Sequence, residues 1–133
     1  MVGTVETEKI TINLGPVDLG QIDLLVQEGF YSNRTDCIRT AMRNQLAQHA
    51  DVVRSCVARK TLALGIHHYA RQELEALQAA GHTLEINVLG LASIAEDVPP
   101  ELAQATIRSI SVLGTLRASP QVRAALRGRI LSP

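Results

Sequence analysis

Apolar and polar residues alternate over residues 9–14, and this period of two predicts a short β-strand. One face of the strand would be apolar, formed by Ile10, Ile12 and Leu14. The opposite face carries groups that can hydrogen-bond, from Lys9, Thr11 and Asn13. A lone strand leaves its backbone groups unpaired, so we expect this segment to pair with another strand.

Two helical patterns follow, separated by a turn. Pro16 suits the first position of a helix and Gly29 suits its end, with an apolar stripe of Leu19, Ile22 and Val26 between them. In the second pattern Asn33 is the expected N-cap, and Asp36 is expected to reach back in a variant of the capping box. The buried face of the second helix is expected to consist of Ile38, Ala41 and Met42.

This order of strand, helix, Gly-aromatic turn, cap and second helix resembles the ribbon-helix-helix superfamily, the Arc, MetJ and CopG type of repressor. The resemblance covers about residues 8–48 and depends on the order of several short signals. In that family two chains pair their strands into an antiparallel ribbon that enters the major groove of DNA. The resemblance therefore implies an intertwined homodimer, since a domain of about 45 residues hardly builds a core alone.

The resemblance assigns base reading to Lys9, Thr11 and Asn13. Lys can donate to guanine, Asn can pair with adenine, and Thr can meet a base edge or a thymine methyl group. The simpler alternative is an amphipathic strand in an ordinary sheet, with these three side chains solvated.

The start of the second helix is the expected phosphate contact, because a helix N-terminus presents unpaired amides and a partial positive charge. The residues there are Ser32, Asn33, Arg34 and Thr35. For Asn33, plain helix capping is the alternative role, and the two roles are compatible.

The charge of this region opposes general DNA binding. The first 50 residues contain four basic and six acidic side chains, a net charge of −2, and the whole chain has a formal net charge of +0. Phosphate neutralisation supplies most non-specific affinity. We therefore expect weak general binding that relies on local contacts and on several dimers.

The middle of the chain is mainly helical in pattern. One long helix, or two helices in line, is predicted between Met42 and Gly65, where no glycine or proline interrupts. Residues 61–66 suggest a short strand, and residues 69–80 a helix that ends at Gly81, with its inward side chains at Leu74 and Leu77.

A weak internal repeat follows. Residues 86–90, INVLG, recur as residues 110–114, ISVLG, and each copy precedes a helix that starts at proline, over 100–107 and 120–127. Two strand-turn-helix units side by side predict a small mixed α/β domain that assembles with copies of itself.

The composition of the chain indicates where in the cell the protein is expected. Hydrophobic residues make up 46% of the 133-residue chain, and no run reaches the roughly 18 apolar residues of a membrane span. The acidic start lacks signal-peptide character, so we expect a cytoplasmic protein, bacterial by its resemblance, with no membrane partner. Cys37 and Cys56 are expected to be small buried thiols, with redox sensing as the lesser alternative.

No metal, cofactor or catalytic site is predicted. Nickel-responsive repressors also join a ribbon-helix-helix to a small mixed domain, and they bind metal through His and Cys there. Here the corresponding residues form no complete ligand set, and surface or turn histidines are the simpler interpretation of His67, His68 and His82, with Cys56 before them. No Ser-His-Asp or Cys-His arrangement suggests an enzyme, and no Gly-rich loop suggests a phosphate pocket.

These patterns predict an α+β protein with a flexible arm over 1–8, a ribbon-helix-helix DNA-binding domain over 9–50, a helical connector over 51–60, and an oligomerisation or partner/effector domain over 61–133. The expected function is transcriptional repression through sequence-specific binding of double-stranded DNA, by a homodimer that forms higher oligomers. One alternative is an antitoxin that autoregulates its operon and binds a toxin protein. Another is a DNA-partition or scaffolding protein whose C-terminal repeats polymerise.

Overall fold

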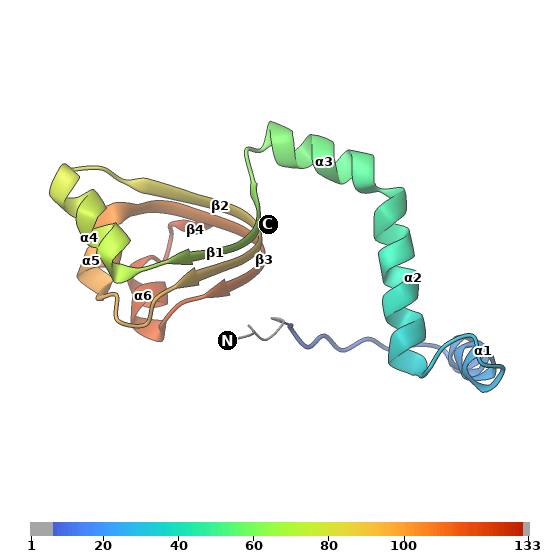
Figure 1. Cartoon of the computed structure of the whole chain (residues 1–133). Coiled ribbons are helices and arrows are strands. Elements are labelled where there is room, and N and C mark those ends of the chain that lie inside the picture. The colour runs from blue at the N-terminus through green and yellow to red at the C-terminus, as the bar shows by residue number, and fades with distance from the viewer. Residues whose placement is uncertain (1–6, 132–133) are drawn as a thin grey trace. The chain divides into compact units, whose positions relative to one another are not determined.

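The computed structural model describes residues 7–131, so most of the predicted arm, residues 1–8, lies outside the described part of the chain. The chain divides into two compact units, Met1–Arg54 and Ser55–Pro133. The elements are coloured by residue number in Figure 1: α1 Pro16–Gln27, α2 Arg34–Gln48, α3 Ala50–Arg59, β1 Ala63–Tyr69, α4 Arg71–Ala80, β2 Leu84–Ile94, α5 Pro100–Thr106, β3 Ile107–Arg117, α6 Pro120–Ala125 and β4 Ile130–Leu131.

In the first unit, α1 begins and ends where the sequence predicted. Pro16 is its first residue, and Gly29 follows its end with a φ of +86°, a conformation that glycine adopts without strain. The amides of Gly29 and Phe30 donate to the carbonyls of Val26 and Leu25, at 3.1 and 2.9 Å. These are the two bonds of a Schellman cap. The predicted stripe is also confirmed, because the half-buried residues of α1 are Leu19, Ile22 and Val26.

The second helical pattern forms α2 and α3, with His49 between them, so it is not one continuous helix. Asn33 is the N-cap of α2 as predicted, since its side-chain oxygen accepts a hydrogen bond from the Asp36 amide at 2.8 Å. Neither glycine nor proline marks the break at His49, which explains why the sequence pattern left it open.

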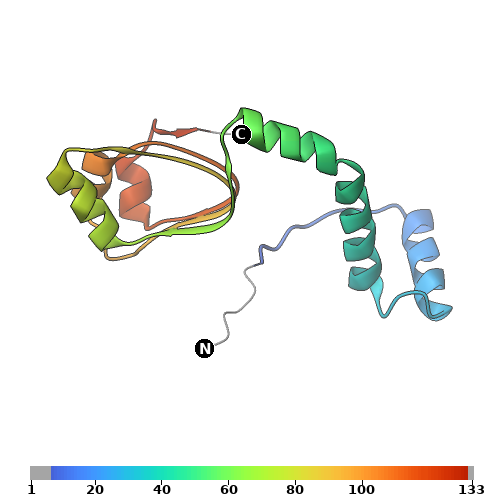
Figure 2. The same ribbon diagram turned by 45° about the horizontal axis from the view of Figure 1, so that its top comes forward.

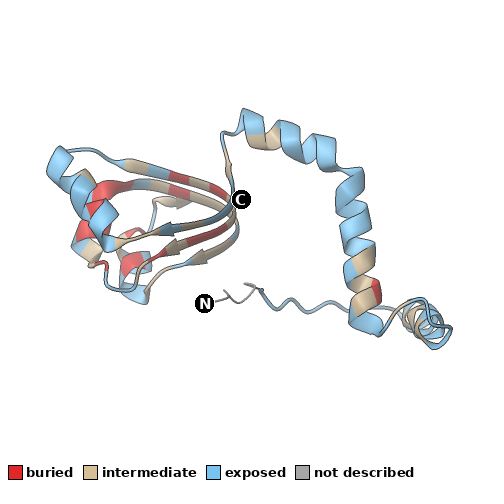
Figure 3. Cartoon of the chain, in the orientation of Figure 1, coloured by how far each residue is buried: buried red, intermediate tan, exposed pale blue. Residues whose placement is uncertain are grey.

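The predicted buried face of α2 is wrong for the single chain. Ile38 is half-buried, but Ala41 and Met42 are exposed. Cys37 is the one buried residue in the described part of the first unit, and Figure 3 shows that unit coloured almost throughout as intermediate or exposed. Two short helices and an extended segment do not enclose a core by themselves.

The predicted antiparallel ribbon is also absent from the described residues of this single chain. Residues 9–14 have no strand partner and lie exposed, and the sheet that the structure contains is parallel and belongs to the second unit. The ribbon of this fold is built from two chains. One chain alone therefore offers no partner strand for the segment.

In the second unit, β1, β2, β3 and β4 form one parallel sheet in that order, and α4, α5 and α6 connect successive strands. Figures 1 and 2 show the three helices gathered at one end of the strands, while β2 and β3 run away from the helices, turn and come back. Both arms of β2 contribute to the core, with Ile86 and Val88 before the turn and Ala92 and Ile94 after it. The unit is a short solenoid in which each turn consists of a bent strand and a helix.

The sequence repeat coincides with the structural repeat. Residues 86–90 pair with residues 110–114 one for one, and the helices that follow begin at Pro100 and Pro120 as predicted. The structure also reveals a third copy in β1, which is in register with β2 so that Gly65 lies opposite Gly90. The predicted strand at 61–66 lies at Ala63–Tyr69, and the predicted helix that ends at Gly81 is α4.

Candidate nucleic-acid interface

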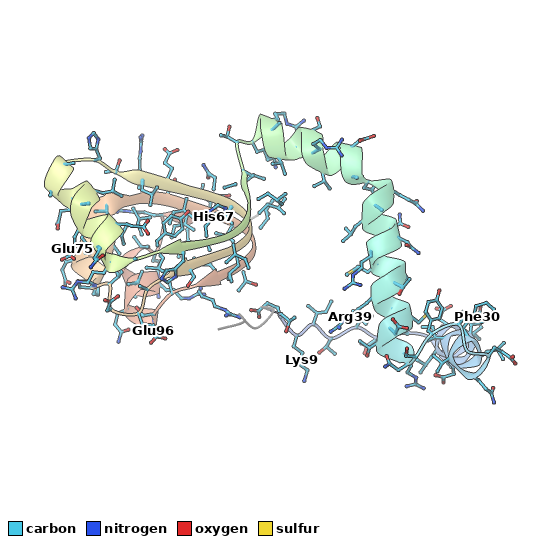
Figure 4. All side chains as sticks on the ribbon, viewed as in Figure 1. Lys9, Phe30, Arg39, His67, Glu75 and Glu96 are labelled. Atoms are coloured by element: carbon cyan, nitrogen blue, oxygen red, sulfur yellow. The ribbon has the colours of Figure 1, made fainter. Side chains whose placement is uncertain are left out.

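The predicted base readers, Lys9, Thr11 and Asn13, lie on the segment that leads into α1, and all three are exposed. Figure 4 shows Lys9 projecting from this segment. The apolar residues between them are exposed as well, at 78% for Ile10, 54% for Ile12 and 41% for Leu14. In the single chain neither face of the segment is covered, so the polar face is accessible and the apolar face lacks a partner.

Both helices of the first unit also expose apolar side chains. They include Val17 and Leu24 of α1, and Met42 and Leu46 of α2, which are between 48% and 73% exposed. Phe30, in the turn between the helices, is 70% exposed and stands out from the chain in Figure 4. So many exposed large apolar side chains in one small unit are typical of an interaction surface.

At the start of α2, two of the predicted phosphate contacts already have partners within the chain. The Asn33 side chain caps the helix, and the Ser32 amide donates to the Asp36 carboxylate at 2.9 Å. The expected capping box is therefore shifted by one residue, since Asp36 reaches Ser32 and not the N-cap amide of Asn33. The Asp36 carboxylate also places a negative charge in the first turn of α2, and this charge would repel a phosphate there.

Arg34, the third predicted contact, forms a two-pronged ion pair with Asp23 of α1. Its Nε and one terminal nitrogen donate to the two carboxylate oxygens at 2.7 and 2.8 Å. The hydrogen bonds from Arg34 lower the pKa of Asp23 below its usual value, and the same contact raises the pKa of Arg34. Both side chains are about half exposed, so the pair is accessible to a competing anion.

The amides of Arg34 and Thr35 have no acceptor within the described chain, as expected for the first turn of a helix. The side chain of Thr35 is exposed beside them. The amides at the start of α2 are therefore available to a ligand without any rearrangement. The Arg34 guanidinium becomes available only after it separates from Asp23. The sequence analysis missed Asp23 because the contact joins two different helices, and no local spacing reveals it.

The histidines and cysteines form no metal centre among residues 7–131, where no group of three His, Cys, Asp or Glu side chains is placed to hold an ion. Cys37 is buried as predicted, whereas Cys56 is only half-buried and accepts a hydrogen bond from Arg59 at 3.5 Å. Both thiols are free. Within the described residues, no helix has the length and apolar character needed to cross a membrane.

Comparison with known proteins places this arrangement in a family. The profile of the ribbon-helix-helix transcriptional regulator family matches residues 5–123. The chain belongs to this family. Regulators of the ribbon-helix-helix family bind DNA and commonly act as dimers. The match continues through β3 and into α6, so the second unit, which the sequence analysis did not recognise, is largely part of the family pattern. Searches of curated proteins and of solved structures gave no match.

Proposed function

We propose that this ribbon-helix-helix regulator is a repressor that reads its operator as a homodimer. The observation that carries the proposal is the exposed apolar surface of the first unit, above all Ile10, Ile12 and Leu14. A second copy would cover these side chains and pair its own segment 9–14 with the first as an antiparallel ribbon. The polar face of the ribbon would then present Lys9, Thr11 and Asn13 from each chain to base edges.

The start of α2 would hold the DNA backbone at both sides of the ribbon. The free amides of Arg34 and Thr35 suit a phosphate oxygen. Arg34 would exchange the Asp23 carboxylate for a phosphate, and this exchange reduces the gain from binding. This exchange, together with the net charge of −2 over the first 50 residues, supports weak affinity for DNA in general. Base contacts would then supply a greater share of the binding free energy.

The second unit would join dimers so that neighbouring half-sites are occupied together. Linked modules bind with the effective concentration of an intramolecular contact, which compensates for weak individual dimers. Repression would then result from occlusion of the operator by several adjacent dimers in the cytoplasm of a bacterium.

The folded second unit favours a repressor over an antitoxin. Antitoxin tails that order only on a toxin need few buried residues of their own. Here Ile86, Val88, Ile107 and Ile110 are all 0% exposed within one chain. The unit has a core without any toxin partner.

The test is recovery of genomic DNA fragments by the purified protein at near-physiological salt. Wild type should enrich a shared inverted or tandem motif. The Thr11→Ala, Asn13→Ala double variant should lose about tenfold or more in affinity for that motif while it remains folded, because it lacks the groups that read bases. A Gln21→Ala, Gln27→Ala variant, changed at exposed positions of α1, serves as the control and should behave as wild type.

Enrichment of the same motif by the Thr11→Ala, Asn13→Ala variant would show that the ribbon face is assigned wrongly. The parallel measurement is Arg34→Ala, which should weaken binding to all sequences alike because a phosphate contact carries no sequence information.

A further inference from the structure

The three bent strands of the second unit stack in register as successive rungs. Along the stack, Leu64 lies beside Leu89 and Leu89 beside Leu113, and on the other side of the bend Ile66, Leu91 and Thr115 are aligned in the same way. Gly65, Gly90 and Gly114 lie between these two rows, with φ values of +116°, +138° and +122°. Three rungs therefore share one backbone conformation at the bend.

The glycines show how closely one rung approaches the next. A Cβ atom on Gly90 would lie 2.2 Å from the carbonyl oxygen of Gly65, and a Cβ on Gly114 would lie 2.1 Å from that of Gly90. The same atom on Gly65 would meet nothing within 4 Å in the described chain. At Gly90 and Gly114, the glycine lies against the carbonyl of the preceding rung, and at Gly65 the corresponding space is open. At the other end of the stack, the carbonyl of Gly114 has no following glycine rung in the described chain.

The two free edges of the stack also match in register. In the described residues, β4 pairs only with Ile110 and Ser111 of β3, so the edge of residues 112–116 that faces away from β2 has no strand beside it. Through β2, residues 112–116 correspond to residues 63–67. These residues belong to β1, whose outer edge has no strand beside it in the described part of the chain, so the two open edges match in register.

Exposure of apolar side chains changes along the rows as stacking would require. Ile66, on the outermost rung, is 68% exposed, whereas its counterpart Leu91 on the middle rung is 8% exposed. Leu64 is also 68% exposed, and its counterpart Leu89 is half-buried. A further rung stacked on β1 would therefore cover Leu64 and Ile66, as β1 covers the corresponding side chains of β2.

We propose that second units of different copies stack head to tail. The edge of β1 in one copy pairs in parallel with residues 112–116 of another, and the carbonyl of Gly114 meets Gly65. The occupant is a second copy because the chain itself carries the matching edge. A head-to-tail contact leaves a free edge at each end, so it adds copies without closing on two. The inference rests on the proposed function for its regulatory meaning, since it names the surface through which dimers would join on DNA.

The test exchanges charges across the contact. In the stack, residue 64 of one copy lies one strand spacing, about 4.8 Å, from residue 113 of the next. Leu64→Lys with Leu113→Lys places like charges together, and Leu64→Lys with Leu113→Glu places opposite charges together. Within one chain the middle rung separates the two positions. Gln78→Lys, at an exposed position of α4, is the control for added charge.

The measurement is sedimentation velocity of the full chain without DNA over a range of concentrations. Wild type and the control should form species larger than a dimer as concentration rises. The Lys–Lys variant should need on the order of tenfold or more protein to assemble, and the Lys–Glu variant should recover assembly. If Leu113→Lys impairs folding, Ile66→Lys at the exposed β1 position should give the same loss.

Three results would overturn the stacking. Wild type could stay dimeric at every concentration, or the Lys–Lys variant could assemble like wild type. If instead the Lys–Glu variant stays as dissociated as the Lys–Lys variant, β1 pairs with another β1 or with a foreign strand. All three results are obtained without DNA, so they differ from a failure of the ribbon to enrich a motif.

Discussion

Arg34 is paired with the carboxylate of Asp23, and in the proposed complex a DNA phosphate would compete with this carboxylate. Its hydrogen bonds lower the pKa of Asp23, so the carboxylate is charged near neutral pH. A lowered carboxyl pKa stabilises the fold above the ordinary carboxyl range, and this contribution is lost as pH falls through the lowered pKa. In the proposed complex, Asp23 would therefore compete with a phosphate for Arg34 throughout the physiological pH range.

Replacing Asp23 by Asn should raise affinity for DNA of any sequence by about threefold to tenfold at low salt, because Arg34 becomes available and one negative charge is removed per chain. Fluorescence anisotropy with a random duplex measures the change. Glu28→Gln removes the same charge from an exposed residue at the end of α1 and serves as the control. An equal gain in both variants would mean that net charge, and not the release of Arg34, governs binding.

Among the elements, the bent strands depend on glycine for two separate reasons. Gly65 and Gly90 both have strongly positive φ, but only Gly90 also lies against the backbone of a neighbouring rung. Any other residue would be strained by the backbone conformation at both positions. At Gly90 its Cβ atom would also clash with the neighbouring rung.

Gly90→Ala should therefore destabilise the second unit by more than about 3 kcal/mol, and Gly65→Ala by about 1–3 kcal/mol. Urea unfolding at low protein concentration, followed by circular dichroism, measures both. Equal losses in the two variants would show that the close contact between rungs adds nothing to the backbone strain.

Helix ends were the elements most easily predicted from sequence. Pro16, Gly29, Asn33 and Gly81 act on the residues next to them, and each lies where the pattern put it. The break at His49 and the bounds of β1 were harder, since neither has a glycine or proline boundary at the right place. A third copy of the repeat was present as an aliphatic-Leu-Gly triplet ending at Gly65, but without the flanking residues of the other two copies.

At the scale of the molecule, the two units differ in what holds them together. Among the described residues, the second unit has a core of twelve buried residues, whereas the first unit contains one buried residue, Cys37. We expect the first unit to fold fully only when two chains associate.

Hydrogen exchange at two protein concentrations separates the units. Dilution should reduce amide protection in α1 and α2, because dissociation of the dimer exposes them. Protection at the central residues Val88 and Ile110 should stay the same, because their strands are paired within one chain. Protection of α1 and α2 that does not depend on concentration would contradict the need for a second copy.

Several local features of this protein could be predicted from its amino-acid sequence alone. They are the ends of α1, the cap of α2, the helices that start at proline, and the order of elements that resembles a ribbon-helix-helix. Each depends on neighbouring residues and on backbone preferences that act over a few positions. The ion pair between Arg34 and Asp23, the parallel register of the rungs and the open glycine face at Gly65 became known only from the folded structure. These depend on segments that are distant in sequence and meet only when the chain folds, and no spacing along the chain specifies them.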